Sequence, residues 1–243
     1  MNPKLEIRNY WNSRKSTYDR SPGHVCLPEV WSSVLRETFN SNMRILDVGT
    51  GTGFLALILT ELGHEVVGLD ISDGMIELAK KKAEKKGLKI QFKLGDAENL
   101  PFKDNSFDAV ICRHLLWTLP SPKKALAEWV RVARYKVVVI DGKWLDNSLS
   151  TKIRKFLDRI LIGIYERRNP FKHIHYRKEI NRTLPFYGGV DREEIVKMFE
   201  SFGLKPKVKD LTWIREIMMR DLPFVYKISW TKNEYYMIEG FKR

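Results

Sequence analysis

The stretch "RILDVGTGTGFLALIL" at residues 44–59 constrains the fold more than any other part of the sequence. Residues 44–48 predict a short apolar strand, and the apolar run from Phe54 predicts a helix. Between them, glycines stand at the alternate positions Gly49, Gly51 and Gly53. Alternate glycines let the backbone pass close to a ligand without interference from Cβ atoms, and they open the next helix. We therefore expect a strand–turn–helix unit that binds a nucleotide-like ligand.

The same alternation of strand and helix continues to Gly142, where the regularity ends. Strands separated by helical crossovers indicate an α/β fold with a doubly wound, parallel sheet. The predicted strands are 44–48, 65–70, 89–96, 107–114 and 135–142, and the predicted helices are 54–63, 72–87 and 121–134.

The remaining segments are less regular. Residues 1–40 are expected to be helical and are rich in aromatic side chains, and residues 191–203 predict another helix. Both "LKPKVKDLTWI" (204–214) and the closing "EYYMIEGFKR" are predicted as strands. Residues 145–190 hold a long amphipathic helix, "LSTKIRKFLDRILIGIYERR", and have ten Lys and Arg against four Asp and Glu, a net charge of +6 (10 − 4).

Composition narrows the class of protein. The chain has 243 residues and a formal net charge of +13, which indicates a surface that tolerates or attracts anions. Cys26 and Cys112 are far apart, so neither a disulfide framework nor a thiolate zinc site is expected. The N-terminus has no apolar signal core, and no apolar run approaches the ~20 residues of a membrane span. These features predict a cytoplasmic protein.

Two nucleotide sites can be weighed at the glycine turn. A phosphate-binding P-loop needs Lys-Ser/Thr after its last glycine, but Phe54 and Leu55 stand there. A dinucleotide site fits better, because "GTGFLA" from Gly51 satisfies GxGxxG/A and Asp70 lies near the expected ~20 residues downstream. Asp47 argues against it, since a carboxylate at the strand end would repel a pyrophosphate.

A cofactor with an ammonium and a sulfonium would instead be attracted by Asp47, and S-adenosylmethionine is such a cofactor. Asp70 then meets the two vicinal ribose hydroxyls. Asp96, in "LGDAENLPF", can accept a hydrogen bond from the adenine amino group, and the Ala97 amide can donate to a ring nitrogen. These acids follow successive strands, at the sheet edge where open α/β sheets bind ligands.

The motifs "ILDVGTGTG", "GLDISDGMIELAKKK", "GDAENLPFKDNSFDAV" and "CRHLLWTLPSP" resemble those of class I S-adenosylmethionine-dependent methyltransferases. The nearest group is the type 11, or ubiquinone/menaquinone-biosynthesis-like, group. The resemblance spans about residues 40–142, with a Tyr-Asp segment in "YWNSRKSTYDRSPGH" that closes over the cofactor in that group. It implies a Rossmann-like, mostly parallel seven-stranded sheet with an antiparallel last strand. One departure is "ARYKVVV" in place of the usual Pro-Gly-Gly, which shortens the turn before the fifth strand.

The site follows from these motifs and the resemblance. The resemblance places Cys112, Arg113 and His114 near the methionine part of the cofactor, largely through their backbone. His114 is either a general base or a hydrogen-bonded positioning residue, with Tyr10, Tyr18 and His24 as alternative bases. The expected cofactor-binding residues are Tyr18, Asp47, Gly49, Thr50, Gly51, Asp70, Ile71, Met75, Asp96, Ala97 and Arg113.

No metal is expected. Methyl transfer from a sulfonium is an in-line displacement that needs alignment and exclusion of water rather than a metal. His173 and His175, in "KHIHYR", lack a third ligand at a clear spacing and are interpreted as solvated loop residues.

The predicted organisation has three parts. Residues 1–40 form a lid, residues 41–144 and 191–243 form the methyltransferase core, and residues 145–190 form a basic insertion that caps the acceptor site. In this insertion, Phe156 and Tyr187 are expected to face inward and to select the acceptor. An apolar stripe could roof the pocket, pair with a second subunit or pack on the sheet; it comprises Ile153, Phe156, Leu157, Ile160, Leu161 and Ile164.

Two functions remain open at this point. The first is a small-molecule methyltransferase, monomeric or homodimeric, and basic residues beside the stripe would favour an anionic acceptor. The second is an RNA or protein methyltransferase that docks its substrate on the basic insertion. Against the second, "CRHLLWTLP" stands where an Asn/Asp-Pro-Pro-Tyr-like signature of amino-group methylation would be expected.

Overall fold

The computed structural model describes residues 2–20, 25–143, 178–220 and 234–242, as well as a few single positions between them. Seven strands form one sheet in the order β3-β2-β1-β4-β5-β7-β6. The first five are parallel, and β7 runs antiparallel to both β5 and β6, which confirms the predicted fold class. The strands are β1 (Arg44–Val48), β2 (Glu65–Asp70), β3 (Gln91–Leu94), β4 (Phe107–Arg113), β5 (Ala133–Gly142), β6 (Lys205–Asp210) and β7 (Tyr235–Phe241).

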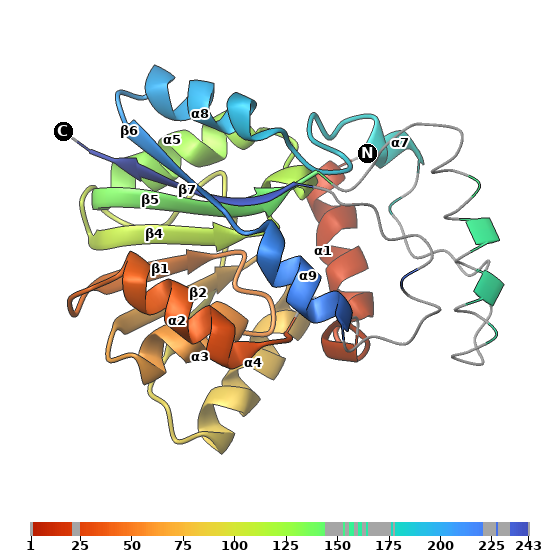
Figure 1. The fold of residues 1–243 in the computed structure, drawn as a ribbon, viewed down its shortest axis with the longest axis horizontal. Helices are drawn as coiled ribbons and strands as arrows, with labels where there is room; N and C mark the ends of the chain where they lie inside the picture. Colours follow the sequence, from red (N-terminus) through yellow and green to blue (C-terminus); the bar gives the residue numbers. More distant parts are fainter. Residues whose placement is uncertain are drawn as a thin grey trace.

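Helices cover both faces of this sheet (Figure 1). They are α1 (Pro3–Arg14), α2 (Pro28–Thr38), α3 (Phe54–Glu61), α4 (Asp73–Lys85), α5 (Pro122–Val132), α7 (Lys178–Asn181), α8 (Arg192–Ser201) and α9 (Thr212–Arg220). There are also two short 3-10 helices. The first, η1 (Tyr18–Arg20), follows α1, and the second, η2 (Leu116–Thr118), follows β4.

The core has two halves because successive strand residues point to opposite faces. Along β5, Val137 and Val139 pack with the helices α5 and α8, whereas Val138 and Ile140 pack with α2, α3 and α9. Strands that are buried on both sides read as continuous apolar runs, which is why the central strands could be predicted from the sequence.

The connection from α5 to β5 needs no loop. α5 ends at Val132 and β5 begins at Ala133, so the shortened turn expected from "ARYKVVV" is confirmed. Lys242, at the end of the chain, donates to the carbonyl oxygens of Val130 (3.1 Å) and Ala133 (2.8 Å). A cation therefore satisfies carbonyls at the end of this helix, where a negative partial charge collects.

The strand predicted over residues 204–214 is wrong in its second half. β6 ends at Asp210, and α9 begins at Thr212. The Asp210 carboxylate accepts the Thr212 amide at 2.8 Å, a local turn that ends the strand. Ile214 and Met219 are the buried residues of α9. The other predicted core elements are present, with ends that differ by a few residues.

The apolar stripe of the insertion does not pack on the sheet. Its six residues are helical, but Phe156 is 53% exposed and Ile164 is 70% exposed. Phe156 therefore does not face inward, and that prediction is wrong. Within the described part of the chain, no helix combines the length and the apolar character needed to cross a membrane.

Candidate functional site

The glycine turn after β1 is built for close approach. Gly49 and Gly51 have positive φ angles of 70° and 54°, a region that side chains with a Cβ rarely adopt. A Cβ on Gly49 would lie 2.8 Å from the Leu115 side chain. A Cβ on Gly51 would meet nothing nearer than Tyr18, at 3.9 Å. The backbone at Gly51 is thus open to a ligand.

Asp70 ends β2 beside this turn. Its carboxylate accepts the Gly51 amide and the Ser72 amide, both at 2.8 Å, so its orientation is fixed from two sides. Burial raises the pKa of Asp70 to about 6, although the amides of Ser72, Gly51 and Ile71 act in the opposite direction. Each carboxylate oxygen has a second lone pair that can accept from a ligand.

Asp47 is the next-to-last residue of the neighbouring strand β1. It is buried, and the Thr50 hydroxyl donates to it at 2.6 Å. Burial raises the pKa of Asp47 to about 6, while the hydrogen bond from Thr50 and the charge of Arg113 lower it. The carboxylate is therefore ionised at neutral pH and attracts a cationic group.

Two adjoining pockets open at the carboxyl ends of these strands. The larger encloses about 710 Å³, including its open mouth, and the smaller about 300 Å³. Tyr18, Gly49 and Arg113 line both pockets.

The pockets bring together the eleven expected cofactor-binding residues and His114. The larger pocket is also lined by Gly51, Asp70, Ile71, Met75, Asp96, Ala97 and His114, and the smaller by Asp47 and Thr50. Cys112 is fully buried, and burial raises the pKa of its thiol, so its side chain does not face a ligand.

Lys4 closes the far end of the larger pocket. Its ammonium lies 2.6 Å from Asp96 Oδ2 and 2.6 Å from the buried Glu98. Asp96 Oδ1 accepts the Glu98 amide at 2.9 Å, and Glu98 also accepts the Ser121 amide at 2.7 Å. Sequence analysis missed Lys4 and Glu98.

His114 lies at the pocket wall in a strained backbone conformation. Its φ of 56° is left-handed, which is uncommon for a residue other than glycine. Its amide donates to the Ile140 carbonyl at 2.9 Å, and its ring lies 5.4 Å from the Tyr235 ring. Strain of this kind is concentrated at functional sites.

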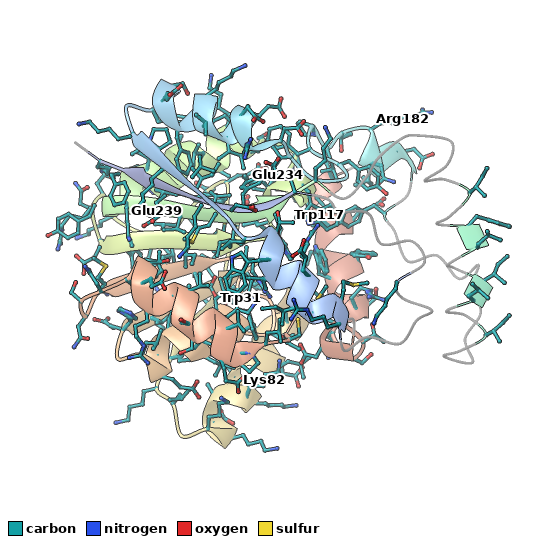
Figure 2. All side chains as sticks on the ribbon, viewed as in Figure 1. Trp31, Lys82, Trp117, Arg182, Glu234 and Glu239 are labelled. Carbon is teal, nitrogen blue, oxygen red and sulfur yellow. The ribbon has the colours of Figure 1, made fainter. Side chains whose placement is uncertain are left out.

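A cluster of aromatic side chains lies beside the larger pocket, and two of its members, Trp11 and Tyr18, line that pocket. Trp11, from α1, lies 5.9 Å from the Tyr18 ring and 6.1 Å from the Trp117 ring. Figure 2 shows Trp117 next to α1. Tyr176 lies 4.5 Å from the Tyr10 ring, and its hydroxyl is hydrogen-bonded to that of Thr118. These contacts join the N-terminal helix to the segment after β5.

Other predicted residues lie apart from the pockets. Tyr187 is half-buried, 6.4 Å from the Trp117 ring, and lines neither pocket. His24, His173 and His175 lie outside the described residues. Within the described ranges, no cluster of three or more His, Cys, Asp or Glu side chains could hold a metal ion.

Comparison with known proteins identifies the domain. Residues 46–140 match the family model of the type 11 methyltransferase domain, a range that runs from β1 into β5. These residues are therefore similar to a type 11 methyltransferase domain.

Curated relatives share parts of this methyltransferase domain and its surroundings. One is an uncharacterized methyltransferase, YcgJ, of Bacillus subtilis, 37% identical over 103 residues, which cover 42% of this chain and 39% of the relative. Another is a demethylmenaquinone methyltransferase of Renibacterium salmoninarum, 45% identical over 142 residues, which cover 56% of this chain and 58% of the relative. The chain thus spans between about two fifths and three fifths of these relatives.

Solved structures have a similar fold. The magnesium protoporphyrin IX methyltransferase of Synechocystis with bound SAH has a TM-score of 0.63 and 18% identity, and the match covers 100% of both chains. The crystal structure of YcgJ has a TM-score of 0.59 and 21% identity, covering 88% of this chain and 99% of that one. These similarities show the Rossmann-like methyltransferase fold.

The methyltransferase domain provides only part of the pocket wall. Lys4, Ile7 and Trp11 line the larger pocket from α1, outside the matched residues. Nothing in the spacing of "KLEIRNYW" marks these residues as ligand contacts, because the helix reaches the site only through its tertiary packing. Their roles could not be found from periodicity alone.

Proposed function

We propose that this chain transfers the methyl group of S-adenosylmethionine to a small-molecule acceptor. The observation that carries the proposal is the pairing of two buried acids, Asp47 and Asp70, at neighbouring strand ends that line adjoining pockets. An acid at both positions favours a cationic sulfonium cofactor with a ribose diol over a pyrophosphate.

The residues of the site fit this cofactor. The Asp70 carboxylate, fixed by two amides, would accept hydrogen bonds from the ribose hydroxyls. Asp96 and the Ala97 amide would meet the adenine, and Asp47 would face the ammonium of the methionine part. When bound, the sulfonium supplies an electrophilic methyl group.

The contribution of the chain to the reaction is alignment and exclusion of water. Apolar walls come from Trp11 and Leu115, which line the larger pocket, and from Tyr18, which lines both pockets. We assign to His114 the acceptance of a proton where the nucleophile carries one, because it lines the larger pocket in a strained conformation.

The acceptor belongs to the side of the site that the N-terminal lid and the 145–190 insertion would cover. The aromatic contacts between α1 and Tyr176 support this arrangement, since they join the two segments beside Trp11, which lines the larger pocket. A small-molecule acceptor is also supported by the names of the relatives, which refer to demethylmenaquinone and to magnesium protoporphyrin IX.

Two measurements test the proposal. Calorimetry is expected to show that S-adenosylmethionine and S-adenosylhomocysteine bind and that NAD does not. Binding of NAD with comparable affinity would overturn the interpretation of Asp47. A labelled-methyl screen against cell extract, separated into small molecules, RNA and protein, is expected to label the small-molecule fraction. Labelling confined to RNA or protein would contradict the proposed acceptor class.

A further inference from the structure

Arg113 occupies the border between the two pockets. It is the last residue of β4, the strand that pairs with β1, and it follows Cys112, the register partner of Val48. The arginine therefore stands beside the first glycine of the turn after β1. It lines both the larger pocket and the smaller pocket that contains Asp47.

Two aromatic rings hold its guanidinium. The central carbon lies 4.6 Å from the Phe54 ring centroid and 4.9 Å from the Trp31 ring centroid. Trp31 is almost completely buried and belongs to α2, where Figure 2 labels it. The guanidinium also hydrogen-bonds the buried Tyr235 side chain. Cation–π contacts hold a planar guanidinium by its faces, and its N–H donors lie in the plane between those faces.

The charges around the pockets are unevenly distributed. Among the described residues that line them, the Lys and Arg side chains are Lys4 and Arg113. Lys4 is ion-paired with Asp96 and Glu98 at the adenine end. At the other end, Arg113 lines the same small pocket as Asp47, and its charge lowers the pKa of that acid. One end of the site thus offers an anion and a cation side by side.

We propose that the Arg113 guanidinium binds the carboxylate of the amino-acid part of the cofactor, while Asp47 binds its ammonium. The inference rests on the proposed function and assigns a role to the Arg113 side chain, where sequence analysis expected its backbone. A guanidinium forms paired, charge-assisted hydrogen bonds to a carboxylate, which a single ammonium does not reproduce. The site then selects a zwitterionic tail rather than adenosine alone.

The test compares two ligands that differ in this tail. S-adenosylhomocysteine has the ammonium and carboxylate, and methylthioadenosine has the same adenosine and thioether without them. Calorimetry on the full chain would measure the affinity of wild type, Arg113→Gln and Arg113→Lys for each of the two ligands. A matched control is Arg44→Gln, because Arg44 also lies over an aromatic ring, 5.0 Å from Phe107, but ion-pairs with Glu65 at the opposite end of the sheet.

We expect Arg113→Gln to weaken S-adenosylhomocysteine binding by roughly 10- to 100-fold, the loss of a charge-assisted hydrogen-bonded pair. Methylthioadenosine binding should change by less than about twofold on the same grounds. Arg113→Lys, which keeps the charge, should lie between wild type and Gln for the first ligand. Arg44→Gln should leave both affinities unchanged.

The other outcomes are decisive as well. Equal loss of both ligands in the Arg113 variants would show that the arginine only supports the pocket wall. Unchanged S-adenosylhomocysteine affinity would overturn the proposal directly. If circular dichroism shows that Arg113→Gln does not fold, Arg113→Lys is used instead. A larger loss of affinity for S-adenosylhomocysteine than for methylthioadenosine then supports the proposal, and equal losses contradict it. Wild-type protein that binds neither ligand would instead refute the proposed function.

Discussion

The Gly51 amide donates to Asp70 Oδ2 at 2.8 Å, so the carboxylate at the end of β2 fastens the glycine turn that follows β1. The other oxygen, Oδ1, accepts the Ser72 amide, which precedes α4. One side chain therefore sets the relative position of two ligand-binding loops. Replacing it by alanine would release both amides and confuse loss of a ligand contact with loss of loop structure.

Asp70→Asn is the sharper test of the ribose contact. Its shape is retained, but its charge is lost, and we expect the affinity for S-adenosylhomocysteine to fall by about 2–3 kcal/mol. The side-chain NH2 of asparagine would face one of the two backbone amides that the carboxylate accepts, so the melting temperature is measured in parallel to separate loss of the loop contact from loss of the ribose contact. Asp73→Asn is the control, since Asp73 is exposed and bonded to Arg8 and Asn12. Normal binding by Asp70→Asn would contradict the assignment.

Cofactor binding should depend on pH near 6. Burial raises the pKa values of Asp47 and Asp70 to about 6, so both carboxylates gain a proton as the pH falls through that value. Protonated Asp47 no longer attracts an ammonium, and affinity for S-adenosylhomocysteine should fall by up to ~10-fold per pH unit per group below it.

Calorimetry across this pH range would measure the slope. Methylthioadenosine, which lacks the ammonium, should follow Asp70 alone and give a shallower dependence. Equal slopes for the two ligands would show that Asp47 does not bind the ammonium.

Asp141, fully buried at the end of β5, should make stability depend on pH. Its pKa is raised from 3.8 to about 7 by burial, against the opposing effects of the Gly142 and Leu116 amides and of Arg215. The folded state thus keeps a proton that the unfolded state releases. This carboxyl therefore carries no penalty below the unfolded pKa, and it lowers the free energy of unfolding progressively between the unfolded pKa and the folded pKa, with the full effect present above the folded pKa.

Asp141→Asn removes this dependence because an amide does not ionise. Relative to wild type, the variant should gain stability between about pH 5 and about pH 8, by on the order of 1–3 kcal/mol. Urea denaturation at both pH values would measure the difference. A gap between variant and wild type that stays constant with pH would show that Asp141 titrates normally.

The sequence predicted the parts of the site whose signals are local. Asp47, Gly49 and Gly51 follow directly from a strand and a turn, and Asp70 follows the next strand, so parallel pairing brings them together. Local signals do not reveal contacts between distant segments. Lys4 reaches Asp96 across 92 positions, and the ring of Tyr10 reaches Tyr176 only after the chain has completed five strands.

The errors have a similar cause. α9 was missed because the apolar residues of "LTWI" suit a strand as well as a short helix, and the turn at Asp210 decides between them. Phe156 was expected to face inward because an amphipathic pattern predicts a buried face but does not say what covers it. The cation–π contacts of Arg113 come from Trp31 and Phe54, on two separate helices. Neither helix sequence alone predicts them.

His114→Asn tests the general-base role. Asparagine tolerates the left-handed backbone that His114 adopts, so the substitution removes the imidazole without adding strain. We expect labelled-methyl incorporation into the active small-molecule fraction to fall by roughly 10²- to 10⁴-fold, the range of a lost general base. The affinity for S-adenosylhomocysteine should be retained. Full turnover with an unchanged pH profile would leave His114 a positioning residue.

Tyr187→Ala tests whether the segment after β5 selects the acceptor. The chain bends sharply there, with φ angles of 100° and 103° at Gly188 and Gly189, and a Cβ on Gly189 would lie 2.2 Å from the Gly142 carbonyl oxygen. The bend brings the Tyr187 ring to within 6.4 Å of the Trp117 ring, close to the pocket but not in its wall.

Removing this ring should loosen the aromatic cover on the acceptor side, while Asp70 and Asp96 lie in the other half of the sheet and keep their contacts. We therefore expect methyl transfer to the active small-molecule fraction to fall about 10-fold or more, as for a misplaced reactant, with S-adenosylhomocysteine affinity nearly unchanged. Tyr187→Phe, which keeps the ring, is the matched control and should behave like wild type. Equal losses of cofactor affinity and turnover in Tyr187→Ala would show that the segment is structural, and the acceptor site would then have to be sought among residues 1–40, where Trp11 already lines the pocket.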